Sequence, residues 1–136
     1  MVLVWGGYAI SAYSNILNLD RILLYSPIST LNENILTFDK NHYIDNEAWI
    51  TYSLDGAETN ASGYIIYDPL YEADNKHASR YSKKLEHLRV SGVGHIVIKH
   101  IADLGMAKWI FRSFVMGKID KETFKIKIMG LASHSI

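Results

Sequence analysis

Cysteine is absent from this chain of 136 residues. The absence excludes a disulfide framework and thiolate metal sites, and it fits a reducing compartment, for which the cytoplasm is the default prediction. An excess of one charge is also missing, because 14 basic residues balance 14 acidic residues. Such a chain has no net field that would draw in nucleic acid or an anionic membrane, so we expect neither as a partner.

Long apolar runs and targeting signals are missing as well. The apolar start at residues 1–5 has no basic segment before it and is interrupted by Gly6 and Gly7, which argues against a signal peptide and a transmembrane span. The composition, 49% apolar and 21% charged, is that of an ordinary soluble globular chain. Its length predicts one domain with a modest core.

Helical and strand patterns alternate in the first half of the chain. Apolar residues at helical spacing predict a helix from about Gly7 to Leu17. The short apolar run from Arg21 to Tyr25, ended by Ser26-Pro27, predicts a strand buried on both faces. From Ser29 to Gly63 the pattern stays open, because residues 47–52 fit either a short helix or an extended segment.

The second half predicts a strand, a helix, a second strand and a long closing helix. These elements cover Tyr64 to Tyr67, Asp74 to Leu85, Leu88 to Val90, and Val97 to Val115. Gly105 is the candidate break in the closing helix. Residues 118–136 are predicted as a C-terminal tail, in which Phe124, Ile126 and Ile128 alternate like an edge strand.

Strands separated by helices imply a mainly parallel sheet with right-handed crossovers and flanking helices. We therefore predict an α/β fold, a partial doubly wound domain over residues 1–117. In such sheets, functional residues gather at the carboxyl ends of the strands. Asp68, Asp74 and His95 all follow predicted strands, so the architecture places them at one edge of the sheet.

An acid and a histidine at the ends of consecutive strands are two of the three groups that orient and deprotonate a serine nucleophile. Glycines before His95 allow the sharp turn that would hold an imidazole there. Asp74 fits a helix N-cap, the acid of the pair, or both. Asp68 fits a turn residue before Pro69, with the acid role as the alternative.

Other histidines carry less weight in this prediction. His77 and His100 are predicted as solvated helix residues. A metal site built from Asp74, His77 and His95 would have a spacing that matches no closed ligand set, so we predict no metal. No cofactor motif is present either.

Four motifs occur in the order of one known family. Gly6-Gly7-Tyr8-Ala9 is similar to the end of a nucleophile elbow of the form G-x-S-M-G-G-Y-A, and residues 21–27 to the strand that follows it. Asp74 falls at the acid loop, and Gly94-His95 matches the histidine loop. The chain thus resembles the carboxyl-terminal half of the α/β-hydrolase fold. Within that superfamily it is similar to small bacterial hydrolase-like proteins found with surface-polysaccharide genes, through Tyr67-Asp68-Pro69 and Asp74-Asn75-Lys76-His77-Ala78.

The resemblance implies a truncated or degenerate serine hydrolase of the esterase or acyl-hydrolase type. His95 would be its general base and Asp74 the orienting acid, while Val4, Trp5, Gly6 and Gly7 would be the remnant of the elbow. Val4 stands at the serine position, and no G-x-S-x-G occurs in the sequence, so we expect the chain to be inactive alone. The parent's substrate would be a small ester or acyl compound.

Two further interpretations stay open. Because the strands that would precede the elbow are absent, the strand at residues 21–25 would leave an edge open to self-association. The chain could therefore be a non-catalytic scaffold or interaction protein, linked to polysaccharide biosynthesis. The other interpretation is an unrelated α/β binding module, in which Gly6-Gly7 opens a helix that holds an anion at its N-terminus.

Overall fold

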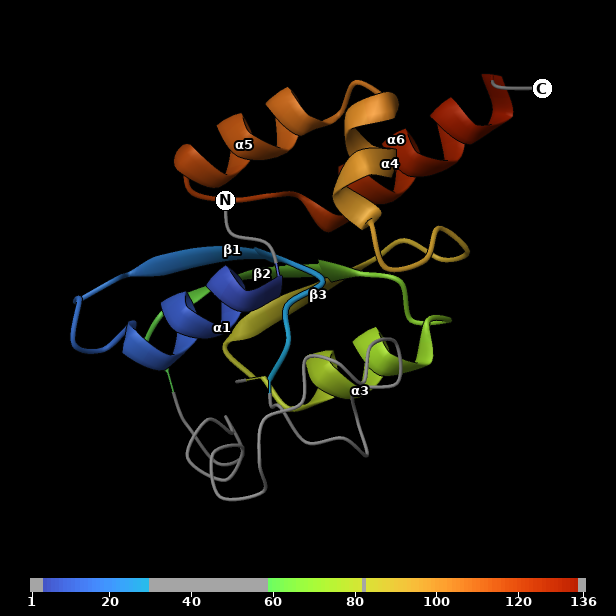
Figure 1. The fold of residues 1–136 in the computed structure, drawn as a ribbon. Coiled ribbons are helices and arrows are strands. Elements are labelled where there is room, and N and C mark those ends of the chain that lie inside the picture. The colour runs from blue at the N-terminus through green and yellow to red at the C-terminus, as the bar shows by residue number, and fades with distance from the viewer. Residues whose placement is uncertain (1–3, 30–58, 82, 135–136) are drawn as a thin grey trace.

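The computed structural model describes residues 4–29, 59–81 and 83–134 (Figure 1). Three parallel strands form a sheet in the order β1-β2-β3, with β1 at Arg21–Tyr25, β2 at Ser62–Tyr67 and β3 at Leu85–Arg89. This sheet and its flanking helices confirm the α/β class. The strand predicted over residues 21–25 is confirmed, and the one predicted over residues 64–67 begins two residues earlier, at Ser62.

Helices cover both faces of the sheet. Figure 1 shows α1 (Val4–Tyr13) and α3 (Glu72–Ser79) on one side, with α4 (Val97–Asp103), α5 (Ala107–Val115) and α6 (Lys121–His134) on the other. In β2, Ile65 packs in the core on the α1 and α3 side and Ile66 in the core on the α4 to α6 side. Both side chains are fully buried, as expected for a strand covered on its two faces.

The first helix differs from its prediction at both ends. It runs from Val4 to Tyr13, so Gly6 and Gly7 lie inside it and not in a turn before it. After Tyr13 the Ser14 hydroxyl donates to the carbonyl of Ser11 at 3.0 Å, and Asn18 adopts a left-handed φ of 52°. The Ser14 hydroxyl competes with helical hydrogen bonding where the helix ends, and the left-handed Asn18 then redirects the chain before β1, so the apolar spacing up to Leu17 does not extend the helix.

The helix predicted to reach Leu85 is also shorter. It ends at Ser79, and Leu85 is the first residue of β3, where it lies opposite Gly63 of β2. Ala78, Tyr81 and Leu85 nevertheless share one core cluster. Their helical spacing therefore did not mark one helix. It arose because α3, the segment after it and β3 all contribute side chains to the same core. The strand predicted at residues 88–90 accordingly begins three residues earlier and ends at Arg89.

The closing helix is broken at Gly105, as predicted, into α4 and α5. Gly105 has a φ of 73°, a left-handed conformation that a side chain would disfavour. The break lets Ile101 of α4 and Ile110 of α5 both reach the core on the same face of the sheet.

The edge strand predicted around Phe124 is wrong, because these residues belong to α6. Asp120 precedes the helix and its carboxylate accepts the backbone N–H of Thr123 at 2.9 Å, which is an N-cap contact. Ile119 and Phe124 are buried in the core against the sheet. The Asp-x-x-Thr spacing was a helix-start signal that the apolar alternation obscured.

Among the described helices, none has both the length and the apolarity needed to cross a membrane.

Candidate functional site

The carboxyl ends of the strands meet at one edge of the sheet, and the ladder extends one residue past each of the outer strands. The backbone N–H of Ser26, which follows β1, donates to the carbonyl of Ile66 at 2.9 Å. The N–H of Val90, which follows β3, donates to the carbonyl of Tyr67 at 2.9 Å. Asp68 directly follows Tyr67, so the three strand exits lie side by side.

Asp74 and His95 form a pair at this edge. The Nδ1 atom of His95 lies 2.8 Å and 2.9 Å from the two carboxylate oxygens of Asp74. The Asp74 side chain is 1% exposed, whereas the imidazole is 23% exposed. A carboxylate facing Nδ1 holds the proton on that nitrogen in the neutral ring, which makes Nε2 the basic nitrogen.

The N-cap role predicted for Asp74 is wrong. Tyr71 occupies the N-cap position of α3 and Asp74 is the third helical residue, and no side chain caps this helix end. Asp74 is instead turned into the protein, where its carboxylate meets the imidazole. The ring of Tyr71 packs beside that imidazole, with the ring centres 5.8 Å apart.

Asp68 contacts the backbone and not the imidazole ring. Its Oδ1 accepts the N–H of Leu70 at 2.8 Å, and its Oδ2 accepts the N–H groups of Val93 and Gly94 at 2.7 Å each. Burial raises the pKa of this carboxyl, but the backbone N–H donors, led by Gly94, outweigh burial and hold the pKa below its usual value. Of the two acids predicted for the pair, Asp74 is thus the one that touches His95.

The loop before His95 turns through two glycines. Gly92 and Gly94 have φ angles of 83° and 77°. A Cβ at either position would meet no atom within 4 Å, so the backbone conformation and not lack of space calls for glycine there. The sequence analysis predicted that these glycines allow a sharp turn before His95, and their left-handed φ angles agree with it.

His77 is not a solvated residue, contrary to the prediction. Its side chain is fully buried, and its Nδ1 accepts the backbone N–H of Ser29 at 2.9 Å, with the Ser29 hydroxyl 3.0 Å away. Burial, with a smaller effect from the charge of His95, lowers the pKa of His77 to about 4. His77 lies three positions after Asp74, so the two lie on the same face of α3. This spacing of His77 and Asp74 was the signal in the sequence that could have predicted the burial of His77.

The first turn of α1 reaches the same edge. A Cβ at Gly7 would lie 2.7 Å from the Cβ of Pro27, just past the exit of β1. Only glycine permits this close approach of helix and strand exit. Val4, Trp5 and Gly6 precede Gly7 in the same turn. Gly7, one of the residues predicted as the elbow remnant, therefore lies beside the exit of β1.

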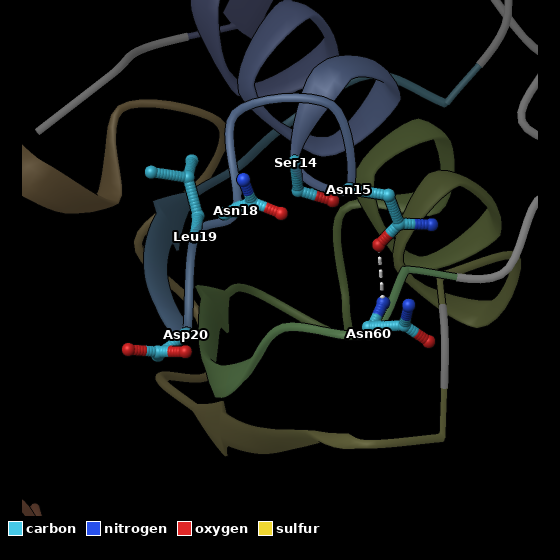
Figure 2. A pocket seen from close by; sticks show the side chains of 6 residues that line it. All are labelled: Ser14, Asn15, Asn18, Leu19, Asp20 and Asn60. Atoms are coloured by element: carbon cyan, nitrogen blue, oxygen red, sulfur yellow. Dashed lines mark hydrogen bonds between the residues drawn. The ribbon is translucent and has the colours of Figure 1, made fainter.

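Two pockets lie at the opposite edge, where the strands begin. One, of about 190 Å³, is lined by residues that flank the starts of β1 and β2, including Asn15, Asp20 and Asn60 (Figure 2). Asn15 accepts the backbone N–H of Asn60 there at 2.7 Å, the contact dashed in Figure 2. The other, of about 240 Å³, lies beside Arg21 and Lys84. Neither pocket includes a member of the Asp74–His95 pair.

The described part of the site thus contains an oriented imidazole, a buried acid and a loop held by a second acid. No group of three or more metal-ligating side chains occurs among residues 4–29, 59–81 and 83–134. No family model, curated protein or solved structure matches the chain.

Proposed function

We propose that this chain carries the acid and histidine of a serine-hydrolase-type site of α/β-hydrolase lineage. The observation that carries the proposal is the contact of Asp74 with Nδ1 of His95 at the carboxyl ends of parallel strands. An acid in that position fixes the tautomer and stabilises the imidazolium that forms when Nε2 takes a proton. The order of the motifs along the chain supports the same lineage.

The proposed chemistry is cleavage of an ester or related acyl bond. A hydroxyl at the start of α1 would attack the carbonyl carbon while His95 takes the hydroxyl proton, and Asp74 would keep the ring in position. Backbone N–H groups at the start of α1 would stabilise the oxyanion. Val4 stands where that hydroxyl belongs and has no nucleophilic atom, so we expect the chain to lack turnover as it is.

Restoring the hydroxyl tests this proposal. We expect the Val4→Ser variant to be labelled at residue 4 by a fluorophosphonate probe and to hydrolyse a short-chain nitrophenyl ester, while the unchanged chain and Val4→Ala do neither. Adding His95→Ala to Val4→Ser should lower the labelling rate by about 100-fold or more, because general-base catalysis contributes on that order. Peptide mass spectrometry locates the labelled residue.

The double variant Val4→Ser with Asp74→Asn should also label slowly, because the amide no longer fixes the imidazole tautomer. A Val4→Ser chain that folds and resists the probe would contradict the proposal. Labelling of the unchanged chain that survives His95→Ala would contradict it as well, since it would place the chemistry on another residue.

A second candidate function is that of an interaction protein, and the outer edge of β1 favours it. Among the described residues β1 pairs with β2 alone. The N–H of Ser26 and the carbonyl of Asp20 point toward β2, so alternation turns the N–H of Leu23 to the outer edge. An unpaired apolar strand edge is a template for pairing with another chain.

We expect the chain to self-associate through this edge as its concentration rises in sedimentation measurements. Leu23→Pro removes an N–H from the outer edge and should shift association to higher concentration. Leu24→Pro, whose N–H faces β2, should instead unfold the sheet. A chain that stays monomeric at every concentration would contradict this function.

A further inference from the structure

We propose that Asp68 is the positioning residue for His95, acting as a built-in anion that holds the loop of residues 91–96 so that the imidazole meets Asp74. This inference rests on the proposed function, because it assigns the part of the site that places the general base. It gives Asp68 a role different from the acid role that the sequence left open.

The contacts of Asp68 divide between the two strand exits. Oδ1 accepts the N–H of Leu70 and closes the turn after β2. Oδ2 accepts two N–H groups in succession, those of Val93 and Gly94, from the loop after β3. The turn after β2 needs only Oδ1 as an acceptor. Oδ2 is therefore available to hold the loop before His95.

The loop has the form of an anion-binding nest. Successive backbone N–H groups beside left-handed residues converge on one point and bind a negative group. Here Gly92 and Gly94 supply the left-handed conformations, and the anion at the point of convergence is the carboxylate of Asp68. Because Gly94 is bonded directly to His95, the nest fixes the backbone position from which the imidazole extends.

Burial makes the carboxylate hard to replace. Asp68 is 2% exposed, and without it the two N–H groups would lose the charged acceptor that the folded chain supplies. An asparagine keeps one oxygen for Leu70 but presents N–H donors to the donors of Val93 and Gly94. An alanine leaves the nest empty, with room for a small carboxylate in place of the missing one.

The experiment compares Asp68→Asn and Asp68→Ala with the unchanged chain by NMR. The readouts are the hydrogen-exchange protection of the Val93 and Gly94 amides and the fraction of His95 in the Nδ1–H tautomer. We expect both variants to lose protection at these amides by about tenfold or more, since bonds to a charged acceptor are broken, and to lose the fixed tautomer. Added sodium formate should restore both readouts in Asp68→Ala, while sodium chloride at equal ionic strength should not.

Two other aspartates provide controls. Asp120→Asn removes a carboxylate that also accepts a backbone N–H, that of Thr123, and should leave both readouts unchanged. Asp74→Asn should release the tautomer of His95 but keep the Val93 and Gly94 amides protected. Loss of the two readouts in Asp68→Asn together with formate rescue of Asp68→Ala supports the inference.

Unchanged His95 readouts in either folded variant would overturn the inference, as would failure of formate to restore a folded Asp68→Ala chain. If Asp68→Ala does not fold, the nearly isosteric Asp68→Asn decides alone. The outcome is separate from that of the proposed function. A Val4→Ser chain that resists the probe removes the hydrolase proposal and leaves the positioning result standing, whereas labelled Val4→Ser with unchanged Asp68 variants removes only the inference.

Discussion

Replacing Gly63 by alanine is expected to prevent the chain from folding. A Cβ at this position would lie 1.9 Å from the carbonyl oxygen of Ile22, its partner in β1, and 2.9 Å from the Ile22 carbonyl carbon and nitrogen. Gly63 also has a φ of 142° and lies in the central strand. The backbone of β1 would have to separate from β2, so we expect a loss of about 4 kcal/mol or more, most of the stability of a small domain.

Gly92→Ala is the matched control for this prediction. Its φ of 83° is also unfavourable for alanine, but no atom lies within 4 Å of the new Cβ, so the loss should be only about 1–2 kcal/mol. Urea denaturation followed by circular dichroism measures both variants. Equal midpoints for the two variants would show that β1 and β2 do not approach each other as closely as their register requires.

Acid is expected to destabilise the folded chain through His77. The pKa of His77 is about 4 in the folded protein and about 6.5 in the unfolded chain, because burial disfavours the charged ring. Between these values the unfolded chain binds a proton that the folded chain does not. The free energy of unfolding should therefore be highest above pH 6.5 and fall by about 3 kcal/mol as the pH drops to 4. The lowered pKa of Asp68 adds a loss only below its usual value of 3.8.

His77→Asn isolates this effect. The asparagine oxygen can replace Nδ1 as acceptor for the Ser29 N–H, but asparagine does not titrate. In the His77→Asn variant, the urea midpoint should therefore change much less between pH 4 and pH 6.5 than it does in the original chain. Lys76→Asn, which introduces the same residue at the exposed neighbouring position, should keep the slope. An unchanged slope in His77→Asn would mean that the folded protein accommodates a charged imidazole there.

The strands of the fold could be predicted because their signals are local. Arg21 to Tyr25 is a short apolar run with a proline after it, and both faces of the sheet require apolar residues there. The break at Gly105 was equally local, since a single glycine supplied the conformation that ends a helix. Tyr81 and Leu85, by contrast, share a core but not a helix, and no periodicity distinguishes these cases.

The candidate site was predictable in part for the same reason. The parallel order of strands brought Asp68, Asp74 and His95 to one edge, as the sequence predicted. Which acid meets the imidazole depended on where α3 begins, because one turn of helix decides whether Asp74 caps the helix or points inward. His77 was missed because burial of a polar residue depends on a partner 48 residues away, the backbone N–H of Ser29.

By itself the sequence determined the class of the fold, the strands, the lack of cysteine and the valine at position 4, since each follows from residue types and their spacing. The tertiary structure alone decided that Asp74 contacts the imidazole while Asp68 holds the loop before it. It also decided the burial of His77 and the helical form of α6. These depend on which backbone N–H groups and side chains meet across the sheet. Hydrogen bonds between distant segments leave no periodic trace in the chain.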